Sequence, residues 1–227
     1  MVSEKMDKNN PIGTGSFSMG RKSGSAIGNN SHAEGYDTTA SGGNSHAEGN
    51  GTTASAYGSH AEGNGTTASG DQSHAEGDTT TASGENSHAE GFNTTASGEN
   101  SHAEGYNTRA SGKDSHAEGF NTIAESSYQH VQGICNVIDS SNKYAHIVGN
   151  GKNIYNRSNA NTLDWNGVPW FQGRPQFGGT AQDQGSQTVM ANGDKEIILA
   201  SSAAGSTKKF KLTIDDTGTL TASEITA

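Results

Sequence analysis

Histidine and glutamate are the residues best suited to chemistry in this sequence, and they recur together in one short motif. The string SHAEG occurs seven times, and each copy begins 14 residues after the one before. All nine histidines occupy the second position of such a copy or of a degenerate copy. Imidazole and carboxylate groups at this spacing can catalyse proton transfer, hold a zinc-like cation or form hydrogen-bonded pairs.

The regular spacing favours architecture over catalysis, because seven identical sites along a repeat are atypical of an active site. The sequence also contains no phosphate-binding loop, CxxC pair or nucleophile–base pair. We therefore predict no enzymatic activity and no cofactor. We favour a structural ladder of histidine–glutamate hydrogen bonds, whose assembly should change near pH 6, over a metal site. The metal alternative stays open for one column: His32, His46, His60, His74, His88, His102 and His116.

The elements that position these residues follow from a second motif, TTASG, which begins seven residues after SHAEG. The unit is therefore [Ser/Thr]-x-Ala-x-Gly-x-x, twice in each 14-residue repeat. A coiled coil is excluded because its seam needs large apolar residues, and a glycine every seven residues would destabilise helices. A five-residue strand followed by a two-residue corner fits better, and its glycine would supply a positive φ or a close approach.

Strand alternation predicts which side chains point into this structure. It places Ser31, Ala33 and Gly35 on one face and His32 and Glu34 on the other. If the small residues face inward, 14 residues complete one flat turn, and successive turns stack about 4.8 Å apart as parallel strands. Residues 21–150 then form a parallel β-roll of eight or nine turns.

The composition agrees with a thin repeat structure and limits the partners. Only 29% of residues are apolar and 32 are glycine, so a wide globular core is excluded. A net charge of −10 disfavours nucleic acid. No apolar segment is long enough for membrane insertion. The N-terminal residues also lack the apolar core of a secretory signal.

A narrow roll buries little apolar area, so we predict that it needs neighbouring copies. Corners after SHAEG often begin with an aromatic residue, whereas corners after TTASG are mostly polar. The candidate subunit contacts are Tyr36, Phe92, Tyr106 and Phe120. An outward threonine column offers a weaker alternative, ice binding, through Thr39, Thr53, Thr67 and Thr95.

The units SHAEGYDTTASGGN and SHAEGFNTTASGEN resemble the head repeats of YadA-like trimeric adhesins. The resemblance covers about residues 20–150. It implies a left-handed parallel β-roll in a homotrimer. The chain departs from that family because it shows no heptad stalk, no membrane-barrel strands and no export signal.

The remaining segments have other compositions. Residues 1–20 fit a linker or attachment segment, and residues 151–180 a tryptophan-rich hairpin around Asn166-Gly167. Its aromatic residues would cap the roll, pack in the trimer or form a recognition surface: Trp165, Trp170, Phe171 and Phe177. Residues 181–227 predict a small antiparallel three-stranded meander.

The C-terminal segments RSNANTLDWNGVPWFQG and GSTKKFKLTIDDTGTLTASE resemble the C-terminal parts of tail-associated proteins of bacteriophages and prophages. This resemblance implies a virion component that is assembled in the host cytoplasm, contacts other tail proteins and binds a bacterial surface polysaccharide or protein. The alternative is an adhesin on the bacterial cell surface that binds host or matrix ligands.

Overall fold

The computed structural model describes residues 13–21, 27–172, 190–192, 196–200, 209–214 and 220–225. Within these ranges every regular element is a β-strand and none is a helix, so no described helix could cross a membrane. The chain forms two compact units, Met1–Trp170 and Phe171–Ala227. The predicted all-β fold class is confirmed.

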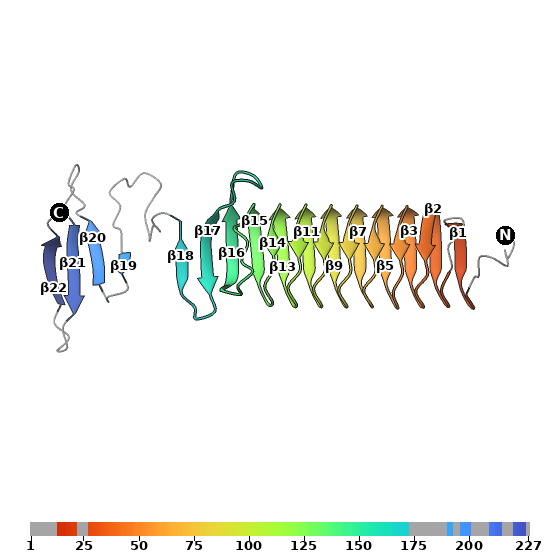
Figure 1. The fold of residues 1–227 in the computed structure, drawn as a ribbon, viewed down its shortest axis with the longest axis horizontal. Coiled ribbons are helices and arrows are strands. Elements are labelled where there is room, and N and C mark those ends of the chain that lie inside the picture. Colours follow the sequence, from red (N-terminus) through yellow and green to blue (C-terminus); the bar gives the residue numbers. More distant parts are fainter. Residues whose placement is uncertain are drawn as a thin grey trace. The chain divides into compact units, whose positions relative to one another are not determined.

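The first unit is a parallel β-solenoid of about nine turns of about 14 residues, as the repeat predicted. Figure 1 shows the turns stacked in sequence order, from β1 to β16. The SHAEG half of each turn forms the longer strands of one row: β1 (Phe17–Arg21), β2 (His32–Ala40), β3 (His46–Asn50), β5 (His60–Asn64), β7 (His74–Asp78), β9 (His88–Phe92), β11 (His102–Tyr106), β13 (His116–Phe120), β15 (His130–Ile134) and β16 (Tyr144–Asn150).

The TTASG half of each turn forms a second row that begins at the end of β2 and continues in two-residue strands. These are β4 (Thr53–Ala54), β6 (Thr67–Ala68), β8 (Thr81–Ala82), β10 (Thr95–Ala96), β12 (Arg109–Ala110) and β14 (Ile123–Ala124). Both rows pair in parallel with equivalent residues aligned, for example His46 with His60 and Thr53 with Thr67. Every side-chain type therefore stacks in its own column.

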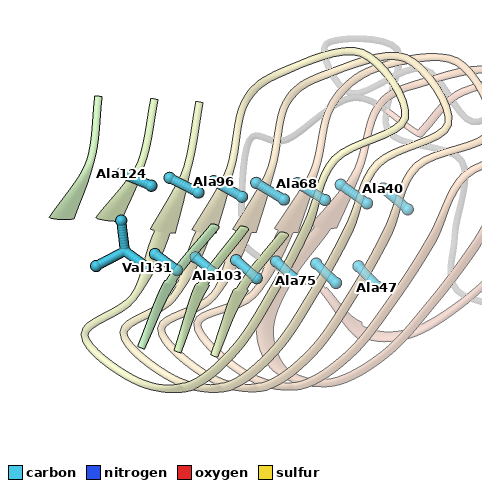
Figure 2. Packing of buried hydrophobic residues seen from close by; sticks show 14 of the residues in the cluster. Ala40, Ala47, Ala68, Ala75, Ala96, Ala103, Ala124 and Val131 are labelled. Atoms are coloured by element: carbon cyan, nitrogen blue, oxygen red, sulfur yellow. The ribbon is translucent and has the colours of Figure 1, made fainter. Parts of the chain in front are cut away.

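Alanine fills the interior between the two rows, with two alanines per turn at 0% exposure (Figure 2). The column on the longer strands ends in Val131 and Ile147, whereas the column on the shorter strands ends at Ala124. A buried serine precedes each SHAEG strand, and all of these hydroxyls except that of Ser73 donate to a carbonyl oxygen of the preceding corner. Ser45 Oγ, for example, donates to the carbonyl oxygen of Gly42 at 2.8 Å. The interior is thus only as wide as two methyl groups.

The fifth-position glycines of the SHAEG strands differ from the sequence expectation, whereas those of the TTASG half, such as Gly42, are buried as expected. Gly35 was placed on the inner face, but this is wrong: it is exposed, and a φ of +115° takes it out of strand alternation. A Cβ at Gly35 would lie 2.1 Å from the carbonyl oxygen of Gly49 on the next turn. The predicted need for a positive φ or a close approach is therefore confirmed.

The two-residue corners depend on residues that tolerate the left-handed region. Asp37 and Asn44 have φ values of +59° and +57°, and Asn or Asp recurs at the same corner positions of later turns. Asparagine side chains also connect successive turns, as where Asn93 Nδ2 donates to Asn107 Oδ1 at 2.7 Å. The corners are therefore held by side-chain ladders as well as by backbone pairing.

At its two ends the solenoid departs from the repeat. β1 pairs in parallel with β2, so the boundary predicted at residue 20 falls inside a strand. At the other end β17 (Asn159–Asp164) pairs antiparallel with β16, and the chain then turns into β18 (Pro169–Phe171). Gly167, with a φ of +78°, lies in that turn, and the Asp164 carboxylate accepts the N–H groups of Asn166 and Val168.

The second unit contains a four-stranded antiparallel sheet in the order β19 (Met190–Asn192), β20 (Glu196–Ala200), β21 (Lys209–Ile214) and β22 (Leu220–Ile225). The predicted C-terminal antiparallel region is therefore present. β19 adds one strand to the three that the sequence indicated.

Candidate functional site

The histidines form one continuous column on the outward face of the longer strands. From His32 to His130, neighbouring rings stack with centroids 4.6 to 4.9 Å apart. Phe17 continues the column beyond His32 in an edge-to-face contact at 4.8 Å. The predicted column of His32, His46, His60, His74, His88, His102 and His116 is thus assembled by the parallel register.

The glutamates form a second column on the same face. The carboxylate oxygens lie 3.2 to 3.6 Å from imidazole Nε2 atoms. At the first turns the pair is within one strand, as in His32 with Glu34, but from His74 to His130 each histidine pairs with the glutamate of the preceding turn. The sequence predicted such pairs but did not indicate this change of partner.

Several of these contacts are too long or too poorly aligned to be hydrogen bonds. His88, His116 and His130 each form one with a glutamate. Five other Nε2 atoms are inaccessible to solvent and have no hydrogen-bond partner in the described structure: those of His32, His46, His60, His74 and His102. The predicted hydrogen-bonded ladder is therefore only partly formed.

Charge on this face is negative and weakly compensated. Burial, followed by the neighbouring histidines, lowers the pKa of His46, His60 and His102, although adjacent glutamates act to raise it. Neutral imidazoles cannot balance the carboxylates. Two carboxylates about 4.8 Å apart repel by about 1 kcal/mol in water and by about 3 kcal/mol at an effective dielectric constant of 20. A cation or a partner subunit would relieve this repulsion.

Glutamate and glycine also line a shallow groove of about 510 Å³ along the first turns. The groove exists because the fifth-position glycines lack side chains beside the glutamate column. Met19 lies at its N-terminal end, and Gly77 on the fourth SHAEG strand lies at the other. The groove thus presents carboxylates and backbone at a regular spacing.

The predicted subunit contacts fall into two places. Phe92, Tyr106 and Phe120 stack with ring centroids 5.0 Å apart and are each nearly half exposed. Tyr36 is 75% exposed and is separated from them by the polar corners of three turns, which begin with Asn50, Asn64 and Asp78. In the single chain the structure therefore joins three of the four candidates into one aromatic column.

The predicted threonine column on the other row is interrupted. Thr39, Thr53, Thr67 and Thr95 stack in register, with Thr81 among them. The next turns place Arg109 and Ile123 in the same column. These bulky side chains break the flat, repeated hydroxyl surface that ice binding would need.

Polar side chains that the repeat pattern does not indicate close the C-terminal end of the roll. Asn136 is fully buried, and its side-chain amide accepts from Ile123 N and donates to Ile123 O. It thereby replaces the missing next strand of the shorter row. Arg157 donates to the carbonyl oxygens of Asn121 and Asn136. The two-residue slip between QHVQG and AHIVG was the only signal of this change.

Asp139 organises the loop that the slip inserts. Its carboxylate accepts the backbone N–H groups of Ser141, Lys143 and Tyr144 at 3.1, 2.8 and 2.8 Å, and the amide of Gln129 at 3.1 Å. Burial acts to raise the pKa of Asp139, but these hydrogen bonds outweigh it and lower the pKa. The carboxylate therefore stays ionised inside the cap.

The described aromatic residues of the tryptophan region leave about half of their surface exposed in one chain. Trp165, Trp170 and Phe171 are 46%, 53% and 44% exposed. Trp170 lines a depression of about 560 Å³ with Tyr144 of β16, with Arg157 and with residues of β17. Phe177 lies outside the described residues. Packing in an oligomer and recognition of a ligand thus remain as roles for the three described aromatic residues.

The stacked turns match a known repeat. The family model of the YadA head domain repeat matches residues 22–45, 33–55, 61–87, 89–115 and 96–122. No curated protein sequence matches the chain. Heads built from this repeat are trimeric, and the family is one of structural adhesins. Repeats of the YadA head domain are therefore found within the parallel solenoid.

Proposed function

We propose that the chain is a non-enzymatic, trimeric, adhesin-like fibre protein that binds a bacterial cell surface. The observation that carries this proposal is the roll itself: an alanine interior locks every turn into one register, and side chains repeat along the outside in continuous columns. Such a surface suits extended contact with sister chains and presents a terminal binding region at a fixed distance.

The trimer is supported by the outward face of the longer strands. This face carries the histidine and glutamate columns and, at the adjoining corner, the stacked Phe92, Tyr106 and Phe120. Each ring leaves nearly half of its surface in water, and apolar burial contributes about 25 cal/mol per Å². Threefold symmetry about an axis parallel to the roll would bury these columns of each chain against a neighbouring subunit.

The mass of the assembly tests this arrangement. Light scattering should give about three times 23.3 kDa at micromolar concentration. The variant Phe92→Ser/Tyr106→Ser/Phe120→Ser should shift the assembly toward monomer. Tyr57→Ser/Tyr128→Ser is the control, because these exposed rings lie on the opposite corner. A monomeric wild-type protein, or equal effects of the two variants, would refute the trimer contact.

We place the binding surface at the exposed aromatic residues that follow the roll. Trp165→Ser/Trp170→Ser should abolish binding of the labelled protein to host bacteria while leaving the trimer mass unchanged. A polysaccharide or a protein receptor would be separated by treating the cells with periodate or with protease. Unchanged cell binding by the double variant would contradict this assignment.

The cellular context has two candidates. In a phage or prophage tail, the protein is assembled in the host cytoplasm beside other virion proteins, and the C-terminal segments support this context through their resemblance to tail-associated proteins. On a bacterial cell surface, the same roll would bind host or matrix ligands, and the YadA repeats support that context equally. Immunogold electron microscopy of lysates and intact cells would separate them by labelling either particles or cell envelopes.

A further inference from the structure

We propose that the histidine–glutamate face binds divalent cations of the zinc class at several positions along the roll. Five groups of three side chains place their ligand atoms within 4.8 Å of one another. The groups are His32–Glu34–His46, His60–Glu62–His74, His74–Glu76–His88, Glu90–His102–Glu104 and Glu104–His116–Glu118. This inference does not depend on the proposed binding to cells.

The distances suit a shared cation better than a direct hydrogen bond. Zinc bonds to nitrogen and oxygen are about 2.0–2.2 Å, so two ligands on one tetrahedron lie about 3.4 Å apart. The separations between imidazole Nε2 and carboxylate oxygen are 3.2 to 3.6 Å. A well-formed hydrogen bond between such groups would be about 2.9–3.0 Å long.

The unpartnered nitrogen atoms are the second observation. Five Nε2 atoms on this face are shielded from solvent and make no hydrogen bond in the described structure. Four of them belong to the ligand groups at the N-terminal side, on His32, His46, His60 and His74. A shielded, unprotonated Nε2 beside a carboxylate is the donor set that zinc prefers, and the cation would supply the partner that these atoms lack.

Overlap between the groups limits the number of ions. The second and third groups share His74, and the fourth and fifth share Glu104. An Nε2 atom has one lone pair, so His74 serves one ion at a time. Three groups can therefore be filled without a shared ligand, and we expect about three ions per chain. Water or a neighbouring subunit would complete each tetrahedron.

The test counts bound zinc on the full chain without an affinity tag. The protein is dialysed to equilibrium against zinc chloride at pH 7.5, and the bound metal is measured by elemental analysis. The variant Glu34→Gln/Glu62→Gln/Glu76→Gln/Glu104→Gln removes a ligand from every group. Gln132 naturally stands at the equivalent position of the degenerate QHVQG copy, so this column tolerates glutamine. The variant should bind less than one ion per chain.

The charge-matched control is Asp71→Asn/Glu85→Gln/Glu99→Gln/Glu125→Gln, whose acidic residues lie outside the column. It should still bind about three ions. Magnesium should not compete, because it prefers oxygen ligands. His46→Gln changes only the first group and should reduce the count by one, which decides the question even if the fourfold variant fails to fold. A wild-type protein that binds no zinc, or a control that loses as much as the fourfold variant, would overturn the proposal.

Discussion

Replacing Gly63 by alanine should strongly destabilise the roll, because two separate penalties meet at that residue. Its φ of +106° lies in a region that L side chains rarely adopt, which costs about 1–3 kcal/mol. A Cβ would also lie 2.1 Å from the carbonyl oxygen of Gly77 on the next turn. That oxygen belongs to the backbone ladder, so relief requires the turns to separate. Overpacking of this kind adds about 1–3 kcal/mol.

Gly65→Ala provides a matched control two residues away. Gly65 also has a positive φ, of +64°, but the nearest atom to its Cβ would be Thr79 Oγ1 at 3.9 Å. The same corner position holds Thr79 and Asn93 in later turns, so a side chain is tolerated there. The control therefore carries only the left-handed penalty of about 1–2 kcal/mol. The two variants should therefore differ by about 1–3 kcal/mol, the overpacking penalty.

Urea unfolding followed by circular dichroism, at one protein concentration, measures this difference. Thermal melts should place the melting temperature of the Gly63 variant roughly 2–12 °C below that of the Gly65 variant, given about 2–4 °C per kcal/mol for a chain of this size. Equal midpoints for the two variants would refute the reasoning, because they would show that the contact between turns carries no penalty.

Three further predictions concern other parts of the roll. Asp139→Asn should destabilise the C-terminal cap by about 1–3 kcal/mol, because the amide cannot accept all of the N–H groups that converge on the carboxylate. Because the pKa of Asp139 is lowered, the stabilisation by its carboxylate is complete above the unfolded-state pKa and decreases as the pH falls toward the folded-state value. The variant should therefore show a smaller decrease of melting temperature at acidic pH than the wild-type protein. The lowered pKa values of His46, His60 and His102 change stability with pH in the same direction, because protonation favours the unfolded chain. The melting temperature should be constant above about pH 6.5 and fall below it. A variant with glutamine at these three positions should lose this dependence on pH. Thr66→Val should raise stability by about 1 kcal/mol in the same melts, because the buried Thr66 Oγ1 has no hydrogen-bond partner, whereas a decrease would indicate a partner for that hydroxyl.

The repeat and its side-chain volumes determine the path of the chain. Alanine, serine and threonine recur at positions that leave no room for a larger side chain, so the two rows must approach closely and stack in one register. That logic predicted the parallel roll, the columns and the inward alanines, because each depends on local alternation and on a period of 14 residues. The aromatic column also followed, since Phe92, Tyr106 and Phe120 occupy one position of the repeat.

Only the tertiary structure decided how the repeat ends and which partners its polar groups find. Asn136 and Asp139 close the roll through contacts with Ile123, Gln129 and residues of the inserted loop, where the periodic pattern no longer applies. The partner of each histidine likewise depends on side-chain rotamers rather than on spacing, so that His74 contacts Glu62 of the preceding turn. Periodicity specifies a backbone because identical turns must stack alike, but the polar contacts depend on side-chain geometry that exists only after the turns have stacked.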